Sequence, residues 1–213
     1  MSSEMNSADC FSAVEREAEI KPHVPGEVGI WVFILGDMLI FGLFFIVFVY
    51  YRGLSVELYS QSQATLNKNY GAINTLFLLA SSWFVAMAVD DMRNKTVKLA
   101  PVFLPLAMLC GLGFGVVKII EYREKISAGI TITSNDFYMY YYIFTGLHFL
   151  HVLIGMGVLV FLWHRARLAV TQADVRDGAV IEKDMVLIES GASYWHMVDL
   201  LWIVLFPLLY LMK

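Results

Sequence analysis

Ionisable side chains occur inside the apolar segments of this chain, where an unpaired charge is costly. Asp37 lies in the run ILGDMLIFGLFF, and His148 and His151 lie three residues apart in TGLHFLHVLIG. His196 and Asp199 are also three apart, in YWHMVDLLW. Residues at this spacing share one face of a helix. In a membrane such groups pair with one another, face a bundle interior, or handle protons and ions.

Asp37 has two interpretations that stay open at this point. Its carboxylate can hydrogen-bond a neighbouring helix as part of the packing. It can also bind or relay protons within the membrane. A second charged pair, Lys118 and Glu121, lies near the end of another apolar run. We expect these two side chains to pair, and both to extend towards the membrane interface.

The histidines do not match a known metal site. A catalytic subunit that holds two haem irons and a copper needs more histidine ligands than the five of this chain, and His23 and His164 lie outside the apolar runs. A di-iron bundle needs two Glu-x-x-His motifs and two further glutamates on facing helices, and the runs contain no such set. We therefore expect no metal, no haem and no catalytic residue, and we expect the His148–His151 pair to be packed or in contact with lipid.

Five apolar segments must position these groups. A helix that spans a bilayer needs about 20 mostly apolar residues. The segments that qualify are 29–51, 71–89, 100–121, 137–163 and 193–212. Short polar loops separate them, at 52–70, 90–99, 122–136 and 164–192. The sequence therefore predicts an all-α, polytopic membrane protein built as a five-helix bundle.

The composition excludes a water-soluble globular protein. Hydrophobic residues make up 59% of the 213 residues and charged residues 16%, against about 45–50% and about 25% in soluble domains. No basic run indicates nucleic acid as a partner. Residues 1–28 are polar and acidic and lack the apolar core of a signal peptide. We predict a flexible cytoplasmic tail at 1–26 and a membrane domain at 27–213.

Lysine and arginine residues predict the orientation, because positively charged loops stay in the cytoplasm. On the side of the N-terminus the chain places nine: Arg16, Lys21, Arg93, Lys95, Lys98, Arg165, Arg167, Arg176 and Lys183. On the other side it places five: Arg52, Lys68, Arg123, Lys125 and Lys213. The N-terminus is therefore predicted to be cytoplasmic and the C-terminus periplasmic. In this topology Asp37, His151, His196 and Asp199 can lie in one layer of the inner half of the bundle.

Five motifs follow one another along the chain. They are ILGDMLIFGLFF (34–45), NTLFLLASS (74–82), KIIEY (118–122), TGLHFLHVLIG (145–155) and YWHMVDLLW (194–202). In this order they resemble subunit III of the cytochrome c and quinol oxidases, which belong to the haem-copper superfamily. The resemblance covers residues 27–213.

The resemblance implies a non-catalytic helical subunit that binds the side of the catalytic haem-copper subunit in the bacterial inner membrane. Such subunits hold no haem or metal, carry structural phospholipid and help to sustain proton uptake and turnover. Asp37 takes the place of the family's intramembrane glutamate. The positions matched to packing or lipid-binding residues of the family are His148, His151, Glu121, Trp195, His196 and Asp199, and we expect the same role for Lys118 beside Glu121.

The sequence departs from the family in three ways. The longest members have two further helices, which help to form a lipid cleft, whereas five-helix members occur in quinol oxidases. Asp37 stands where glutamate is usual, and Lys118 replaces an uncharged residue. The opening VPGEVGIWVFILGDMLIF, residues 24–41, most resembles the subunit-III-like accessory protein encoded with bacterial nitric oxide reductase.

We therefore predict a nitric oxide reductase as the catalytic partner. The first alternative is subunit III of an oxygen-reducing quinol or cytochrome c oxidase. A stand-alone proton-coupled transporter and a pure assembly factor are further alternatives. The chain shows no inverted repeat and no pair of broken helices, which many transporters have.

Overall fold

A computed structural model describes residues 26–93, 99–171 and 178–212. The predicted tail at 1–26 lies outside these ranges except for its last residue. The described residues form helices joined by short turns and include no strand. The predicted all-α fold is therefore confirmed.

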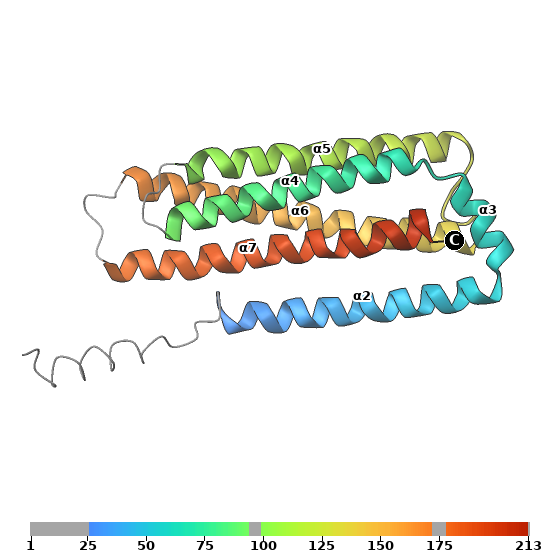
Figure 1. Cartoon of the computed structure of the whole chain (residues 1–213), viewed down its shortest axis with the longest axis horizontal. Coiled ribbons are helices and arrows are strands. Elements are labelled where there is room, and N and C mark those ends of the chain that lie inside the picture. The colour runs from blue at the N-terminus through green and yellow to red at the C-terminus, as the bar shows by residue number, and fades with distance from the viewer. Residues whose placement is uncertain (1–25, 94–98, 172–177, 213) are drawn as a thin grey trace, which may run out of the picture.

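Five long helices run side by side along the molecule (Figure 1). They are α2 (Val28–Leu54), α4 (Lys68–Arg93), α5 (Ala100–Ser127), α6 (Asp136–Thr171) and α7 (Gly178–Phe206). Even the shortest, α4 with 26 residues, is about 39 Å long at 1.5 Å per residue. This exceeds the roughly 30 Å hydrocarbon core of a bilayer. Each of the five carries an apolar stretch sufficient to cross it, so the predicted number of spans is confirmed.

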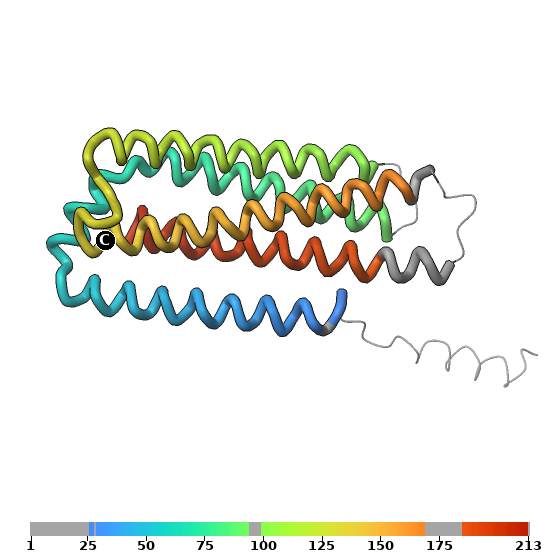
Figure 2. The backbone as a smooth tube through the Cα atoms, turned by 180° about the vertical axis from the view of Figure 1, so that it is seen from behind, coloured from blue at the N-terminus to red at the C-terminus, as the bar shows by residue number. Residues whose placement is uncertain are grey.

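The helices alternate in direction, so the bundle has two ends. We call the end where α2 begins the N-terminal end, and the end where α2 finishes the C-terminal end. Both views place α2 at the edge of the bundle, along α7 and apart from α4 and α5 (Figures 1 and 2). Aromatic rings join α2 to α6, among them Phe41 to His151 and Phe48 to Phe144. Which end faces the cytoplasm stays a prediction.

Helix α7 begins earlier than the sequence pattern predicted. The predicted span started at residue 193, whereas α7 starts at Gly178 and its apolar part runs over Met185–Leu211. The intervening residues carry several charges. These charges lower the hydropathy of the segment but do not prevent it from forming a helix. As a result, His196 and Asp199 lie near the middle of the span instead of near its start. Much of the loop predicted at 164–192 is helical.

A short helix, α3 (Val56–Ala64), occupies the loop predicted at 52–70. It lies across the C-terminal end of the bundle between α2 and α4 (Figure 1). Its Tyr59 is buried and packs edge-on against Phe48 of α2 and Phe137 of α6. Burial raises the pKa of Tyr59 to about 12, so this phenol is neutral at physiological pH.

Two prolines shape the long helices. Pro105 in α5 has no N–H to donate to the carbonyl of Pro101 one turn earlier. The indole Nε1–H of Trp163 on α6 donates to that carbonyl instead, at 3.2 Å. Pro207 follows α7, and the chain continues as a π-helical turn over Pro207–Leu211.

Trp195 of α7 occupies the centre of the core and is fully buried. Glycines on the two neighbouring helices make room for its ring. A Cβ atom added to Gly155 of α6 would lie 2.7 Å from Trp195, and one added to Gly111 of α5 would lie 3.2 Å from it. Close packing around small residues is typical of membrane helix bundles. It places α5, α6 and α7 close enough for their polar side chains to meet.

Candidate functional site

Asp37 of α2 and His151 of α6 meet inside the bundle. The Asp37 Oδ2 atom lies 3.3 Å from His151 Nε2, and each residue is 14% exposed. Phe41, one turn along α2, packs its ring edge-on against the imidazole. The sequence predicted both residues as polar members of the membrane core, and the structure brings them together.

The hydrogen bonds of His151 determine how many protons Asp37 and His151 can bind together. His151 Nδ1 lies 2.7 Å from the carbonyl oxygen of Leu147, which only accepts, so Nδ1 carries a proton. A hydrogen bond between Nε2 and Asp37 Oδ2 then needs one further proton, either on the imidazole or on the carboxyl group. In the present geometry the Oδ2 atom makes no hydrogen bond among the described residues. The pair can therefore hold one exchangeable proton.

Lys118 and Glu121 form a second site within α5, near the C-terminal end of the bundle. Lys118 Nζ donates to Glu121 Oε2 at 2.9 Å and to the Tyr210 hydroxyl at 3.0 Å. The Tyr210 hydroxyl in turn donates to Glu121 Oε1 at 2.7 Å. The predicted pairing is present. The expected extension to the interface is wrong, because both side chains are only 1% exposed and are enclosed by α6 and α7.

Aromatic rings surround the Lys118 ammonium group. Ring centroids lie between 4.9 and 5.5 Å from Nζ, from Tyr122, Tyr141, Trp202 and Tyr210. Cation–π attraction is strongest where the cation is removed from water. Together with the carboxylate, these rings compensate for the desolvation of a buried charge. The cluster joins α5, α6 and α7 by polar contacts that all lie inside the protein.

His148 faces the core, one turn from His151 on α6. Its ring packs against Phe114 and Trp202, with centroids 5.5 and 5.2 Å away. The residue has no exposed surface, and neither ring nitrogen has a hydrogen-bond partner in the described part of the chain. A lipid headgroup cannot reach the ring in this position. Of the two roles expected for His148, helix packing is the one that its location allows.

His196 and Asp199 face α4. His196 Nδ1 lies 2.6 Å from the Ser82 hydroxyl of α4, so these two groups share a hydrogen bond. In the sequence, Ser82 was marked only by its place at the end of the motif NTLFLLASS. Among the described residues, no hydrogen bond or ion pair joins His196 or Asp199 to the Asp37–His151 pair. The four residues thus belong to two separate sites, one between α2 and α6 and one between α4 and α7. That they share one layer of the membrane stays a prediction.

The sequence alone missed two kinds of residue. Tyr210 completes the Lys118–Glu121 cluster from a helix 89 positions further along the chain. Trp163 caps a carbonyl that a proline left free. The first depends on how the π-helical turn after α7 lies against α5, and no spacing rule reports that. The second had a signal, since Pro105 must leave a carbonyl without its helical donor.

No group of three His, Cys, Asp or Glu side chains that could hold a metal occurs in the ranges that the structure describes.

Fold and polar sites together define a multi-pass helical membrane protein whose charged residues pair inside the bundle. The family model of cytochrome c oxidase subunit III matches residues 24–213, and the chain belongs to this family. The predicted resemblance is therefore confirmed. With five apolar helices, family membership also supports the predicted location, as a multi-pass protein of the bacterial inner membrane.

Curated relatives of the chain carry oxidase names. It is 28% identical to cytochrome c oxidase subunit 3 of Thermostichus vulcanus, over 87% of this chain and 86% of that protein. It is 25% identical to quinol oxidase subunit 3 of Bacillus subtilis, over 87% and 86%. It also matches the heme-copper oxidase subunit I+III of Aeropyrum pernix, at 24% identity over 85% of this chain and 22% of that longer protein. The special resemblance of residues 24–41 to a nitric oxide reductase accessory protein stays a prediction.

Proposed function

We propose that this chain is the non-catalytic subunit III of a haem-copper respiratory complex, bound in the membrane to the catalytic subunit I. The observation that carries the proposal is the family match over residues 24–213. The Aeropyrum relative supports the partner, because its name places subunits I and III in one chain. Where subunits I and III are separate chains, they must bind each other within the bilayer to lie side by side in the same way.

The geometry supports a stabilising role for this subunit. Two of its polar contacts, Asp37–His151 and Lys118–Glu121–Tyr210, tie helices together inside the bundle. The outer face of α2 is apolar and exposed, with side chains such as Leu35, Leu39 and Leu43. This face suits lipid or the apolar side of another membrane subunit. We propose that the subunit carries structural phospholipid and binds no cofactor itself.

The subunit's second role in this proposal is to sustain turnover. The Asp37–His151 pair can hold one proton inside the membrane. A group of this kind next to a proton-consuming catalytic subunit can buffer proton supply as the reaction proceeds. Loss of the chain is then expected to shorten the active lifetime of the complex more than it lowers the initial rate.

The finer proposal concerns the partner. The residues 24–41 favour a nitric oxide reductase, which would place the protein in denitrification. The names of the relatives favour the alternative, an oxygen-reducing cytochrome c or quinol oxidase in aerobic electron transport. Asp37 and Lys118 do not discriminate between these partners, because both side chains point into the helix bundle and away from a partner subunit.

One experiment tests role and partner together. Membranes from the native host with and without this chain are assayed for oxygen and nitric oxide consumption over many turnovers. We expect one of the two activities to begin at a similar rate and then decay faster when the chain is absent. Faster decay of nitric oxide reduction identifies a reductase partner, and faster decay of oxygen reduction identifies an oxidase. Unchanged decay of both would overturn the proposed function.

A further inference from the structure

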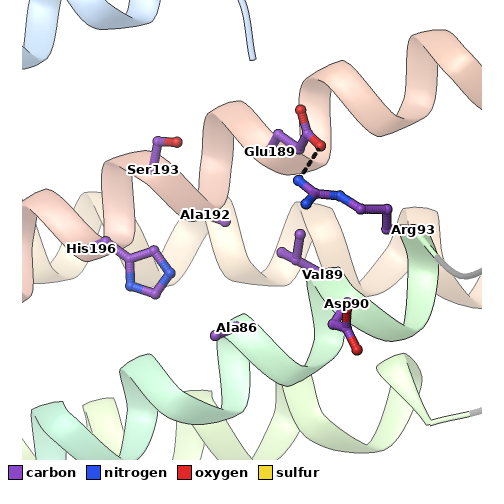
Figure 3. A pocket seen from close by; sticks show the side chains of 8 residues that line it. All are labelled: Ala86, Val89, Asp90, Arg93, Glu189, Ala192, Ser193 and His196. Carbon is purple, nitrogen blue, oxygen red and sulfur yellow. Dashed lines mark hydrogen bonds and ion pairs between the residues drawn. The ribbon is translucent and has the colours of Figure 1, made fainter. Parts of the chain in front are cut away.

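A pocket opens between α4 and α7 towards the N-terminal end of the bundle (Figure 3). Its volume is about 220 Å³, and its lining residues are Ala86, Val89, Asp90, Arg93, Glu189, Ala192, Ser193 and His196. The charged side chains lie towards the mouth, where Arg93 and Glu189 form a 2.7 Å ion pair. Small residues, Ala86 and Ala192, leave the space between the two helices open. A pocket of this size, with charged and polar side chains among its lining residues, has room for several water molecules.

The lining of this pocket continues directly into the membrane interior. On α7, the residues Glu189, Ser193 and His196 follow one face of the helix, and Asp199 lies one turn deeper on that face. On α4, Ser82 lies one turn deeper than Ala86. His196, the deepest lining residue on α7, therefore forms the floor of the pocket, and its hydrogen bond to Ser82 leads further into the bundle. Asp199 lies directly beyond this floor.

Asp199 has unsatisfied hydrogen-bonding capacity. The residue is 4% exposed, and neither carboxylate oxygen has a hydrogen-bond partner in the described ranges. Ser82 neighbours the carboxyl group, and its hydroxyl can accept from His196 Nδ1–H while donating to one oxygen of Asp199. At least one carboxyl oxygen still lacks a partner. A buried carboxyl group without partners is costly, and ordered water is the usual way in which proteins satisfy such groups. The pocket on the other side of His196 is a source of that water.

We propose that this pocket is a water-filled inlet through which Asp199 exchanges protons with the aqueous phase at the N-terminal end of the bundle. Water enters past the Arg93–Glu189 ion pair, and the His196–Ser82 hydrogen bond relays the proton across the floor. The titratable groups that line the route are Asp90, Glu189 and His196, with the cation Arg93 at the mouth. Water both supplies and receives the proton, so the exchange needs no other reactant. The inlet is separate from the Asp37–His151 pair and does not depend on which catalytic subunit is the partner.

Side-specific cysteine labelling tests the inlet in the intact complex. The background carries Cys10→Ser and Cys110→Ala, and single Ser82→Cys and Asp199→Cys variants are compared in sealed membrane vesicles of both orientations. The probe is a small, charged, membrane-impermeant methanethiosulfonate. Val198→Cys is the matched control, because Val198 is equally deep on α7 and fully buried. Ser82→Cys replaces a single oxygen atom with sulfur and should therefore fold. It keeps the test decisive if the Asp199 variant does not fold.

We expect the Ser82→Cys variant to be labelled from the side of the N-terminal end and the Val198→Cys variant to stay unlabelled. Filling the pocket with Ala86→Leu and Ala192→Leu together should abolish that labelling. Three results would overturn the inlet. They are labelling no faster than that of the control, labelling from the opposite side, and labelling that the filled pocket does not change.

Discussion

The carboxylate of Asp37 lies 3.3 Å from His151 Nε2, across the contact between α2 and α6. The opposite ring nitrogen of His151 is already engaged with the carbonyl of Leu147. The contact is thus a hydrogen bond only when the pair holds an additional proton. This relationship separates the two roles that Asp37 can have, since an amide preserves the packing and removes the carboxyl group that can take up a proton.

Asp37→Asn is therefore expected to leave the complex assembled. The Asn amide can donate to the unprotonated His151 Nε2, so the helix contact is kept within about 1 kcal/mol. Proton uptake by the carboxyl group is lost, and activity should decay sooner during sustained turnover. The measurement compares haem content, subunit yield and activity decay with those of the wild type. Failure of the variant to assemble would assign Asp37 to packing.

Lys118→Gln should destabilise the protein strongly. It leaves the buried Glu121 carboxylate without its cation, a loss of about 3–5 kcal/mol for a buried ion pair. The double variant Lys118→Gln with Glu121→Gln removes both charges and keeps an acceptor for the Tyr210 hydroxyl. We expect it to recover most of the thermal stability in detergent. A double variant as unstable as Lys118→Gln alone would contradict the role given to the ion pair.

Two glycines of α6 provide a matched comparison of packing. Gly155→Ala places a methyl group 2.7 Å from Trp195 and should cost about 1–3 kcal/mol. Gly157→Ala meets no atom within 4 Å and should be neutral or slightly stabilising, because alanine favours a helix. Thermal unfolding of both variants in the same detergent gives the answer. Equal stability of the two would show that Trp195 has room to move.

His148 should tolerate an apolar replacement. Its ring nitrogens have no partner within the described residues, so His148→Leu fills similar space without breaking a hydrogen bond. His148→Ala leaves a cavity beside Phe114 and Trp202 and should cost about 2–4 kcal/mol. Bound phospholipid should be unchanged in both variants, by lipid analysis of the purified protein. Depletion of lipid by the leucine variant would show that the ring is reached by a headgroup.

The sequence predicted the five spans well because apolar length alone decides whether a segment can cross a bilayer. It placed the start of α7 fifteen residues too late, because charged residues before Glu189 reduce hydropathy without breaking the helix. Spacing along one helix predicted the Lys118–Glu121 pair correctly. Contacts between helices depend on helix rotation, which spacing does not report. For that reason the sequence did not predict the contact of His196 with Ser82 of α4.

Affinity purification tests the central claim most directly. The tagged protein is extracted from its native host in a mild detergent, and the eluate is examined by mass spectrometry and haem absorption. We expect a haem-copper superfamily catalytic subunit in constant proportion to this chain, either a nitric oxide reductase or an oxygen-reducing subunit I. A chain that purifies alone and without haem, under every respiratory condition of growth, would contradict its assignment as a subunit.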